Sequence, residues 1–529
     1  MQNQPPAQPA FRTLPDLIRE HAGRRPFAYA LCDDSESLDY AALDALMDRI
    51  AASLQRDGLR PGDVIALCAS PSARYAAVML GALRAGVVPA PLAPSSSAAS
   101  MAAMLRDADA RAVFVDGVSD GLVPAGPDAP MRVALDAGVP GQRFEEWLTP
   151  RGTRPAPVEI ESSAPFNVIY SSGTTGTPKG IVQSHGMRWA HIQRGVAYGY
   201  GPESVTLLAT PLYSNTTLVS FVPALGGGGC VRVMRKFDAA AYLQLAQRVR
   251  ATHTMLVPVQ YQRIMARPDF GDFDLGSFRF KFCTSAPFSA ALKADVLARW
   301  PGGLVEFYGM TEGGGTCILE AHAFPDKLHT VGRPAATSDI RLIDEAGVQL
   351  PGEPGVAGEV VGHSPGMMTG YRNQPEKTRE AEWFDATGKR FIRTGDVGVF
   401  DADGFLTLID RRKDMIISGG FNIYPSDIEA GLRAHPSVLD VAVIGVPSAQ
   451  WGETPVAYVV TAGAPDGAVT DAATPAEIMA WYNAAAGKTQ RLADLRTIGE
   501  LPRSAIGKVL KRELRDLYLA SGRSGPTVC

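Results

Sequence analysis

The chain has 529 residues, more than one hydrophobic core usually organises, so we expect two or more domains. Hydrophobic residues make up 46% of it and charged residues 20%, which is typical of a folded globular protein and excludes general disorder. The formal net charge is −4, from 51 basic and 55 acidic side chains without long blocks of one sign, so we expect no nucleic-acid partner.

The first half of the chain alternates helical and strand-like segments. Apolar spacing predicts helices over residues 14–22 and 41–57 and a strand at 64–68, followed by a helix at 74–85 and a strand at 86–91. More apolar strands are predicted between helices at residues 111–115, 205–209, 230–234, 255–258 and 280–283. This alternation predicts layered α/β architecture with largely parallel sheets.

The pattern changes after about residue 330. Short strands separated by glycine-rich turns are predicted at residues 339–343, 358–361, 390–395 and 397–408, which indicates a β-rich subdomain over about 330–410. A compact series then begins at residue 411, with strands at 415–417, 438–446 and 454–460 and helices at 425–434 and 476–485. We therefore predict a large N-terminal body, 1–410, and a small α+β C-terminal domain, 411–529.

Several features bear on where the protein works. The six cysteines are scattered, without a CxxC pair or a zinc-site spacing, and are interpreted as reduced thiols of a cytoplasmic protein. The first eleven residues lack the basic start and apolar core of a signal peptide. The most apolar run, residues 76–94, contains Arg84 and is broken by glycine and proline, so we expect no membrane span. A homodimer is compatible with the sequence, which does not determine the oligomeric state.

The segment SSGTTGTPKG, residues 171–180, follows an apolar strand predicted at 166–170. Glycines that allow close backbone approach, N–H and hydroxyl donors and one cation are what a loop needs to bind polyphosphate. It is not a Walker A loop, because Pro178 precedes Lys179 and no Ser or Thr follows. A flexible turn is the alternative interpretation, but the order of five hydroxyls, two internal glycines and a Pro-Lys-Gly end argues against it.

Further segments follow the loop in a set order: Tyr308-Gly-Met-Thr-Glu312, Ile392-Arg-Thr-Gly-Asp396, residues 410–422 (DRRKDMIISGGFN) and Leu501-Pro-Arg-Ser-Ala-Ile-Gly-Lys508. With them the chain resembles the adenylate-forming (ANL) superfamily of acyl- and aryl-CoA synthetases, in particular 4-chlorobenzoate- and coumarate-type CoA ligases. The resemblance extends over about residues 165–512. It implies a large α/β N-terminal domain and a small, mobile C-terminal domain. It also implies ATP, Mg²⁺ and CoA as cofactor and co-substrates.

The resemblance implies a nucleotide site whose phosphate contacts are Ser171, Ser172, Gly173, Thr174, Thr175, Gly176 and Lys179. Thr175 and Lys179 would act in catalysis, as would Glu312, which is similar to the family's magnesium-binding glutamate. Around the base and ribose it implies Ser285, Ala286, Pro287, Tyr308, Gly309, Thr311, Asp396 and Arg411. Taken singly, a surface glutamate, a buried tyrosine or a turn aspartate would each be the ordinary interpretation.

Lys508 lies on a predicted loop near the C-terminus and resembles the lysine that bridges the carboxylate and the α-phosphate during adenylation. A lone lysine near a terminus is usually just solvated, but Leu-Pro-Arg precedes this one and Val-Leu-Lys-Arg-Glu-Leu follows it. Lys413 occupies the family's hinge position. We therefore expect the small domain to rotate between two half-reactions, which withdraws Lys508 and brings in the turn at residues 418–420.

CoA is the favoured acceptor, and the resemblance implies contacts with it at Gly419, Gly420, Trp451, Lys488 and Arg491. Each of these residues also has an ordinary structural interpretation. The usual Tyr-Lys-x-Pro segment is replaced here by Gly487-Lys-Thr-Gln490, which weakens the comparison at this point.

The acyl pocket is expected at Ser214, Asn215, Thr284, Gly314 and Gly315. Many relatives have His where this chain has Ser214, so the aromatic-pocket histidine is absent. Three glycines, 313–315, follow Glu312 and indicate either extra room or close backbone packing. We predict a bulky acid, aryl or medium-chain, rather than acetate.

The sequence thus predicts an ATP-dependent carboxylic acid:CoA ligase that forms an acyl-adenylate and pyrophosphate, then a thioester and AMP. A stand-alone adenylation enzyme that loads a carrier protein is the alternative. A nonenzymatic nucleotide-binding protein would need a broken site, whereas Lys179, Glu312, Asp396, Arg411 and Lys508 are all present.

Overall fold

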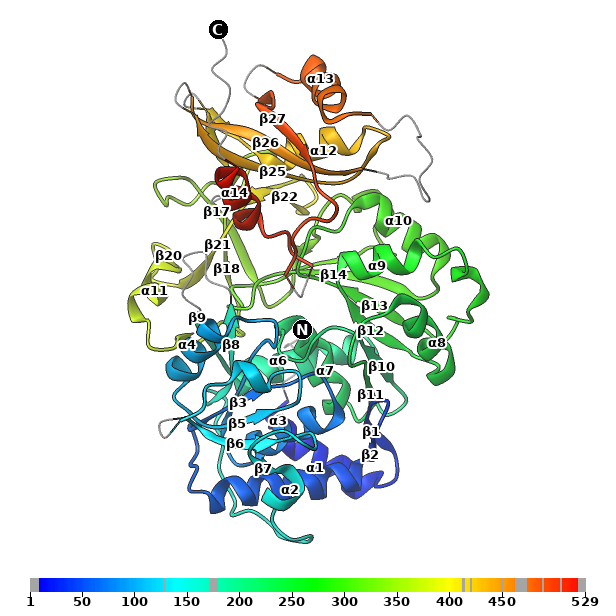
Figure 1. Ribbon diagram of the computed structural model, residues 1–529, viewed down its shortest axis with the longest axis vertical. Coiled ribbons are helices and arrows are strands. Elements are labelled where there is room, and N and C mark those ends of the chain that lie inside the picture. Colours follow the sequence, from blue (N-terminus) through cyan, green and yellow to red (C-terminus); the bar gives the residue numbers. More distant parts are fainter. Residues whose placement is uncertain are drawn as a thin grey trace, which may run out of the picture. The chain divides into compact units, whose positions relative to one another are not determined.

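The computed structural model describes residues 9–126, 129–171, 179–411, 414–418, 421–448, 451–461, 473–487, 490–504 and 507–521 (Figure 1). The chain forms two compact units. The first comprises Met1–Ile340 and Gly362–Ile392, and the second comprises Arg341–Val361 and Arg393–Cys529. The chain therefore passes from one unit to the other three times. The domain boundary expected between residues 410 and 411 stays a prediction.

The largest sheet has nine strands in the order β16-β15-β14-β13-β12-β10-β11-β1-β2. Its interior strands are parallel, and β2, β15 and β16 are antiparallel to their neighbours. The strands are β1 (Tyr29–Cys32), β2 (Ser37–Asp39), β10 (Val205–Leu208), β11 (Cys230–Val233), β12 (His253–Leu256), β13 (Phe280–Cys283), β14 (Gly303–Tyr308), β15 (Cys317–Glu320) and β16 (Arg333–Pro334). Parallel strands covered by helices are what the alternating apolar pattern predicts.

The first unit also contains two smaller sheets. Five parallel strands in the order β4-β3-β5-β6-β7 form one of them, namely β3 (Val64–Cys68), β4 (Val88–Pro91), β5 (Ala110–Val115), β6 (Met131–Ala134) and β7 (Gln142–Arg143). The other is antiparallel, in the order β19-β9-β8, with β8 (Pro165–Ser171), β9 (Lys179–Ser184) and β19 (Gly370–Tyr371). The hairpin between β8 and β9 carries the glycine-rich loop.

Most helices of the first unit begin at side chains that accept N–H hydrogen bonds, such as Thr13, Asp39 and Ser72. They are α1 (Leu14–Arg24), α2 (Tyr40–Arg56), α3 (Ala73–Arg84), α4 (Ala98–Ala108), α5 (Phe144–Trp147), α6 (His185–Ala197), α7 (Asn215–Gly226), α8 (Ala239–Val249), α9 (Pro258–Met265), α10 (Ala290–Arg299) and α11 (Pro375–Glu380). Three short 3₁₀ helices are η1 (Asp120–Leu122), η2 (Phe270–Asp272) and η3 (Pro325–Lys327).

The β-rich region contains a sheet in the order β17-β18-β21-β20, with β22 paired to β21. Its strands are β17 (Asp339–Ile343), β18 (Ala357–His363), β20 (Glu382–Phe384), β21 (Arg390–Phe400) and β22 (Leu406–Arg411). The predicted strands at 390–395 and 397–408 are wrong in their division, because β21 is continuous and the chain turns after it. The Asp401 carboxylate accepts the N–H groups of Asp403 and Phe405, both at 2.9 Å, and Gly404 has a φ of 79°.

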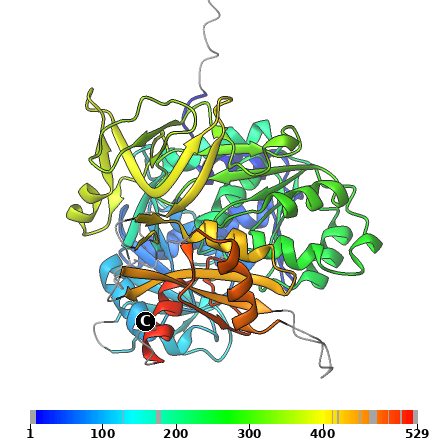
Figure 2. The same cartoon turned by 90° about the horizontal axis from the view of Figure 1, so that it is seen from above.

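The C-terminal part is a further sheet in the order β24-β23-β26-β25, with β27 paired to β26. Its strands are β23 (Ile416–Ser418), β24 (Phe421–Ile423), β25 (Val438–Ser448), β26 (Gly452–Thr461) and β27 (Asp494–Thr497). The buried side chains of β25 alternate between two clusters. Helices α12 (Pro425–Arg433) and α13 (Pro475–Ala485) cover one face, and α14 (Lys511–Ala520), red in Figures 1 and 2, covers the other.

The predicted fold class is confirmed, since layered α/β sheets are combined with a β-rich region and a small α+β part. In the part of the chain that the structure describes, none of the helices has the length and apolar character needed to cross a membrane.

Two helical glycines provide a test of the packing of α2 against α3. A Cβ atom added at Gly81 would lie 2.6 Å from the Ile50 Cβ atom, whereas one added at Gly23 of α1 would meet nothing within 4 Å. We expect Gly81→Ala to destabilise the protein by about 1–3 kcal/mol through overpacking. The matched Gly23→Ala should stabilise it by up to about 1 kcal/mol, because alanine favours the helix. Thermal unfolding checks this, and equal Tm shifts in the two variants would contradict it.

Candidate functional site

The carboxyl ends of β13 and β14 lie side by side, because the strands are parallel with Cys283 opposite Glu306. Ligands of α/β sheets bind outside such strand ends. Ser285, just beyond β13, has a φ of 84°, which non-glycine residues rarely adopt, and its hydroxyl pairs with that of Thr216 on α7. A strained residue at this edge is typical of a functional loop. The predicted base-binding residues therefore follow neighbouring strands, with Thr284, Ala286 and Pro287 after β13 and Tyr308, Gly309 and Thr311 at the end of β14.

Tyr371 connects two of the predicted catalytic residues. Its hydroxyl donates a 2.8 Å hydrogen bond to Oε1 of Glu312, and the Lys179 Nζ atom lies 5.0 Å from the centre of its ring. Burial first, and then the charge of Glu312, raise the pKa of Tyr371, so the hydroxyl stays protonated and donates. The backbone carbonyl of Glu312 also accepts the N–H of Met368 at 2.7 Å. A cation and an oriented carboxylate are thus held at the end of the glycine-rich loop.

Gln183 connects the loop after β14 to the start of α7. Its side-chain amide nitrogen donates to the Thr311 carbonyl at 2.7 Å and to Oδ1 of Asn215 at 3.3 Å. Ser214 accepts the N–H of Thr216 and caps α7, which begins at Asn215. Asn215, predicted in the acyl pocket, is therefore linked to the loop that carries Glu312. Sequence analysis missed both Gln183 and Tyr371; a polar residue within the apolar strand β9 was the available signal for Gln183, and Tyr371 had none.

The three glycines after Glu312 are packed closely against neighbouring backbone and side-chain atoms. A Cβ atom on Gly313 would lie 2.0 Å from the Gly366 carbonyl oxygen, and one on Gly314 would lie 2.6 Å from Cβ of Ile392. Gly315, with a φ of 97°, would meet Cδ1 of Ile340 at 2.4 Å. Of the two explanations left open by the sequence, close packing accounts for these glycines and extra room does not. The assignment of Gly314 and Gly315 to the acyl pocket stays a prediction.

The phosphate loop itself lies mostly outside the described residues, which exclude Ser172, Gly173, Thr174, Thr175 and Gly176. Its two ends are defined, because Ser171 closes β8, Lys179 opens β9, and the two residues are paired. Gly180 follows Lys179, and a Cβ atom added at Gly180 would lie 3.0 Å from Cγ1 of Val168. The two ends of the phosphate loop therefore lie side by side, as a loop that encloses a ligand requires.

The second unit brings together the two residues predicted at the ribose. Asp396 and Arg411 are direct partners in the pairing of β21 with β22. Asp396 was expected after a strand, but β21 continues through it, because the β22 pairing extends to this position. The backbone N–H of Asp396 donates to the Thr394 hydroxyl at 3.0 Å. The strand pairing places the backbones of the two residues opposite each other, and their ribose role stays a prediction.

The exposed Lys508 lies on a tight turn of the second unit. Ser504 donates its N–H to the Lys508 carbonyl at 2.8 Å and accepts the Lys508 N–H at its hydroxyl, 3.2 Å away. Arg503 donates to the Gly507 carbonyl at 2.7 Å and forms an ion pair with Asp440 at 2.5 Å. Gly507 has a φ of 77°, which explains the glycine before the lysine. The turn is therefore anchored to β25.

The remaining predicted contacts are only partly described. Lys413, Gly419, Gly420 and Lys488 lie outside the described residues. Trp451 is 43% exposed, and Arg491 is also exposed. Their roles at CoA stay predictions.

Comparison with known proteins identifies the family. The family model described as AMP-binding enzyme matches residues 18–372, and the model described as AMP-binding enzyme C-terminal domain matches residues 427–508. The chain belongs to the AMP-binding enzyme family. This confirms the resemblance to the adenylate-forming superfamily of acyl- and aryl-CoA synthetase type.

Relatives of this AMP-binding enzyme match it over nearly its whole length. It is 33% identical over 496 residues to feruloyl-CoA synthase of Amycolatopsis sp, covering 93% of this chain and 96% of the relative. Fatty acid–[acyl-carrier-protein] ligase ScoC of Streptomyces coeruleorubidus is 29% identical over 520 residues, covering 96% and 97%. ATP-bound MatB from Rhodopseudomonas palustris superposes with a TM-score of 0.84 at 28% identity, covering 97% and 100%. The AMP-binding enzyme is therefore an AMP-forming ligase that uses ATP.

The hydrogen bond from Tyr371 to Glu312 generates a test. We expect Tyr371→Phe to lower kcat/KM for ATP by about 10-fold, because Glu312 loses a charge-assisted hydrogen bond while the ring beside Lys179 remains. The measurement is acid-dependent pyrophosphate release. Tyr29→Phe serves as the control, since Tyr29 is 56% exposed on β1. An unchanged kcat/KM in Tyr371→Phe would contradict the role assigned to this hydroxyl.

Proposed function

We propose that the protein joins a carboxylic acid to CoA in two steps. A carboxylate oxygen of the acid attacks the α-phosphorus of ATP, the bond to pyrophosphate breaks, and an acyl-adenylate forms. The CoA sulfur then attacks the acyl carbon, and AMP leaves with the electron pair of the acyl–oxygen bond.

The arrangement of Lys179, Tyr371 and Glu312 carries this proposal. Two anions must approach each other in the first step, so the site has to offset their repulsion. Lys179 supplies a cation at the end of the phosphate loop, and Glu312 supplies a carboxylate whose direction is fixed by Tyr371. Family membership and the likeness to ATP-bound MatB support ATP as the nucleotide.

Glu312 suits a magnesium ion that is held largely by nucleotide oxygens. Mg²⁺ usually takes one or two protein carboxylates and keeps phosphate and water ligands, and it would neutralise phosphate charge. Among the described residues, no group of three or more His, Cys, Asp or Glu side chains could form a complete protein cage for a metal. A single oriented carboxylate therefore fits a shared ion better than a resident structural one.

The second unit would supply the remaining groups of the active site. Asp396 and Arg411 would hold the ribose, and Lys508 would bridge the attacking carboxylate and the α-phosphate. The proposed alternation, with Lys413 as hinge, would then exchange Lys508 for the 418–420 turn before thioester formation. Gly419, Gly420, Trp451, Lys488 and Arg491 are proposed to contact CoA, and Ser214, Asn215 and Thr284 to contact the acid.

We expect Lys508→Ala to reduce acid-dependent pyrophosphate release by about 100-fold or more, because the attacking carboxylate loses its counter-charge. Thioester formation from supplied acyl-adenylate should continue, since Lys508 acts only in the first step. Single-turnover assays of each half-reaction measure this, with the exposed Lys236→Ala as control. Equal losses in both half-reactions would contradict the role of Lys508.

A carrier protein is the second candidate acceptor, because ScoC is similar over 96% of this chain. CoA is favoured, because feruloyl-CoA synthase has the higher identity, 33%, and the exposed Trp451 offers an aromatic face to a nucleotide. We expect the acyl group to be trapped on CoA in preference to a holo-carrier protein at equal concentration. Mass spectrometry of both products decides this, and faster loading of the carrier would contradict the CoA assignment. The similarity to feruloyl-CoA synthase also supports an aryl acid as the substrate, and a medium-chain acid is the alternative.

A further inference from the structure

Helix α6 carries basic side chains at intervals of three residues, and Arg188, His191 and Arg194 are the last three of them. This spacing places them along one side of the helix. Within the ranges that the structure describes, neither arginine forms an ion pair with a carboxylate. Arg188 donates to the amide oxygens of Asn167, at 3.0 Å, and Gln183, and it lies 3.3 Å from Nδ1 of His191. The positive charge of this helix is therefore not balanced by a nearby negative one.

Burial makes this imbalance costly above all for Arg188, which is buried, whereas His191 and Arg194 are half-buried. Desolvation lowers the pKa of Arg188 to about 9, and it lowers the pKa values of Arg194 and His191 as well. A charge removed from water is stabilised mainly by an opposite charge or by hydrogen bonds to charged groups. Arg188 finds amide oxygens. Among the described residues, the contact of the Arg194 guanidinium is a cation–π contact with Phe307, in which the guanidinium carbon lies 5.0 Å from the ring centre.

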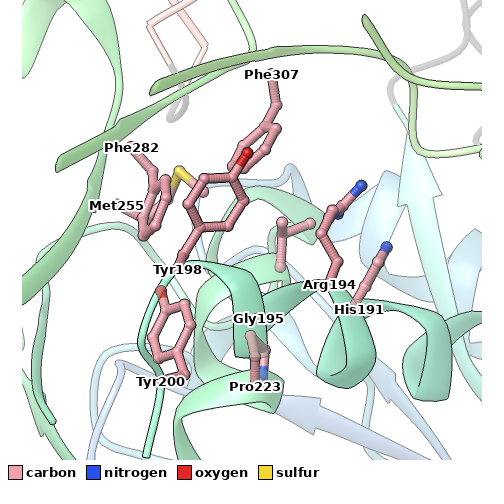
Figure 3. A pocket seen from close by; sticks show the side chains of 10 residues that line it. His191, Arg194, Gly195, Tyr198, Tyr200, Pro223, Met255, Phe282 and Phe307 are labelled. Carbon is pink, nitrogen blue, oxygen red and sulfur yellow. The ribbon is translucent and has the colours of Figure 1, made fainter. Parts of the chain in front are cut away.

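Arg194 and His191 line a small pocket (Figure 3). They extend from α6 along one side of it, and Met255 and Phe282 lie on the opposite side. The flat face of the guanidinium stacks on Phe307, whereas its N–H donors point outward from the edge of the group and are not used by this contact. No side chain or carbonyl among the described residues accepts a hydrogen bond from Arg194. The pocket thus combines apolar walls with one cation whose donors have no protein acceptor there.

The hydroxyl groups nearest to Arg194 are already committed elsewhere. Tyr198 donates to Oε1 of Glu320 at 3.3 Å, and the Tyr200 hydroxyl pairs with Ser220 at 2.5 Å. In the part of the chain that the structure describes, neither hydroxyl is an acceptor for Arg194. An incoming oxygen anion could accept a charge-assisted hydrogen bond from Arg194, as a carboxylate does from a guanidinium.

Some residues that line the pocket lie close in sequence to residues predicted to hold the acid or the base. Val219, which lines it, is one helical turn after Asn215 on α7. Phe282 of β13 lies two residues before Thr284, so the two side chains are expected on the same side of the strand. Phe307 of β14 directly precedes Tyr308. The cavity measures about 10 Å³, room for about one water molecule. It has room for one terminal oxygen atom of an acid and no space for a ring.

We propose that Arg194 binds a second carboxylate of the acid, at the end remote from the one that is activated, so that the substrate is a dicarboxylic acid. This inference rests on the proposed adenylation and adds the substrate class. Arg194 is then a specificity-determining residue, and the acid spans from the α-phosphate to the α6 pocket. The chain between the two carboxylates is either aromatic or aliphatic, which the test distinguishes.

The experiment compares matched acids in acid-dependent pyrophosphate release by the full chain with ATP. One pair is terephthalate and 4-methylbenzoate, and the other is adipate and hexanoate; each pair differs in the second carboxylate. We expect wild type to favour the dicarboxylate of at least one pair by about 10-fold or more in kcat/KM. Arg194→Gln should remove about 10- to 100-fold of that preference, mainly through KM, with little change for the monocarboxylate.

Arg143→Gln is the matched control, because the Arg143 side chain is 64% exposed at the end of β7. Arg194→Lys keeps a cation without the planar fork and should retain part of the preference. A wild-type preference for the monocarboxylate in both pairs overturns the inference, even if the variants fail to fold. So does an equal effect of Arg194→Gln on both members of a pair. If no acid of any kind releases pyrophosphate, the proposed function itself fails and the inference fails with it.

Discussion

The hydrogen bond from Tyr371 to Glu312 joins two sheets of the first unit. Tyr371 ends β19 of the three-stranded sheet, whereas Glu312 follows β14 of the nine-stranded sheet. The same small sheet contains β8 and β9, which hold the ends of the phosphate loop. One hydroxyl group therefore fixes a carboxylate of one sheet relative to the loop of another. Packing of Gly313–Gly315 against Gly366, Ile392 and Ile340 keeps this approach close.

Local sequence pattern predicted individual elements well. The strands at 64–68, 280–283 and 339–343 coincide with β3, β13 and β17, because a short apolar run between breakers leaves little choice. The prediction failed at 397–408, where a turn built on Asp401 and Gly404 interrupts an otherwise strand-like run. The pairing of β1 with β11, some 200 residues apart, could not be predicted, because periodicity contains no information on partners.

The candidate site shows the same division between local and long-range information. Lys179, Glu312 and Asp396 could be proposed because each lies in a short segment of distinctive composition. Tyr371 and Gln183 could not, because their importance arises only where β19 and β9 approach the loop after β14. Arg194 was likewise not singled out, since an arginine on an amphipathic helix normally faces water. Its lack of an acidic partner among the described residues becomes visible only after folding.

The three crossings of the chain between its compact units affect how such enzymes can be recombined. A single junction between two parental genes would exchange the C-terminal segment from residue 393 onward but leave Arg341–Val361 with the other parent. The second unit of such a hybrid would contain segments from both parents. Strands β18 and β21 would then come from different parents, and so would the two residues of the ion pair between Glu359 and Arg393. Grafting a whole unit therefore requires that the 341–361 insert travel with the C-terminal part.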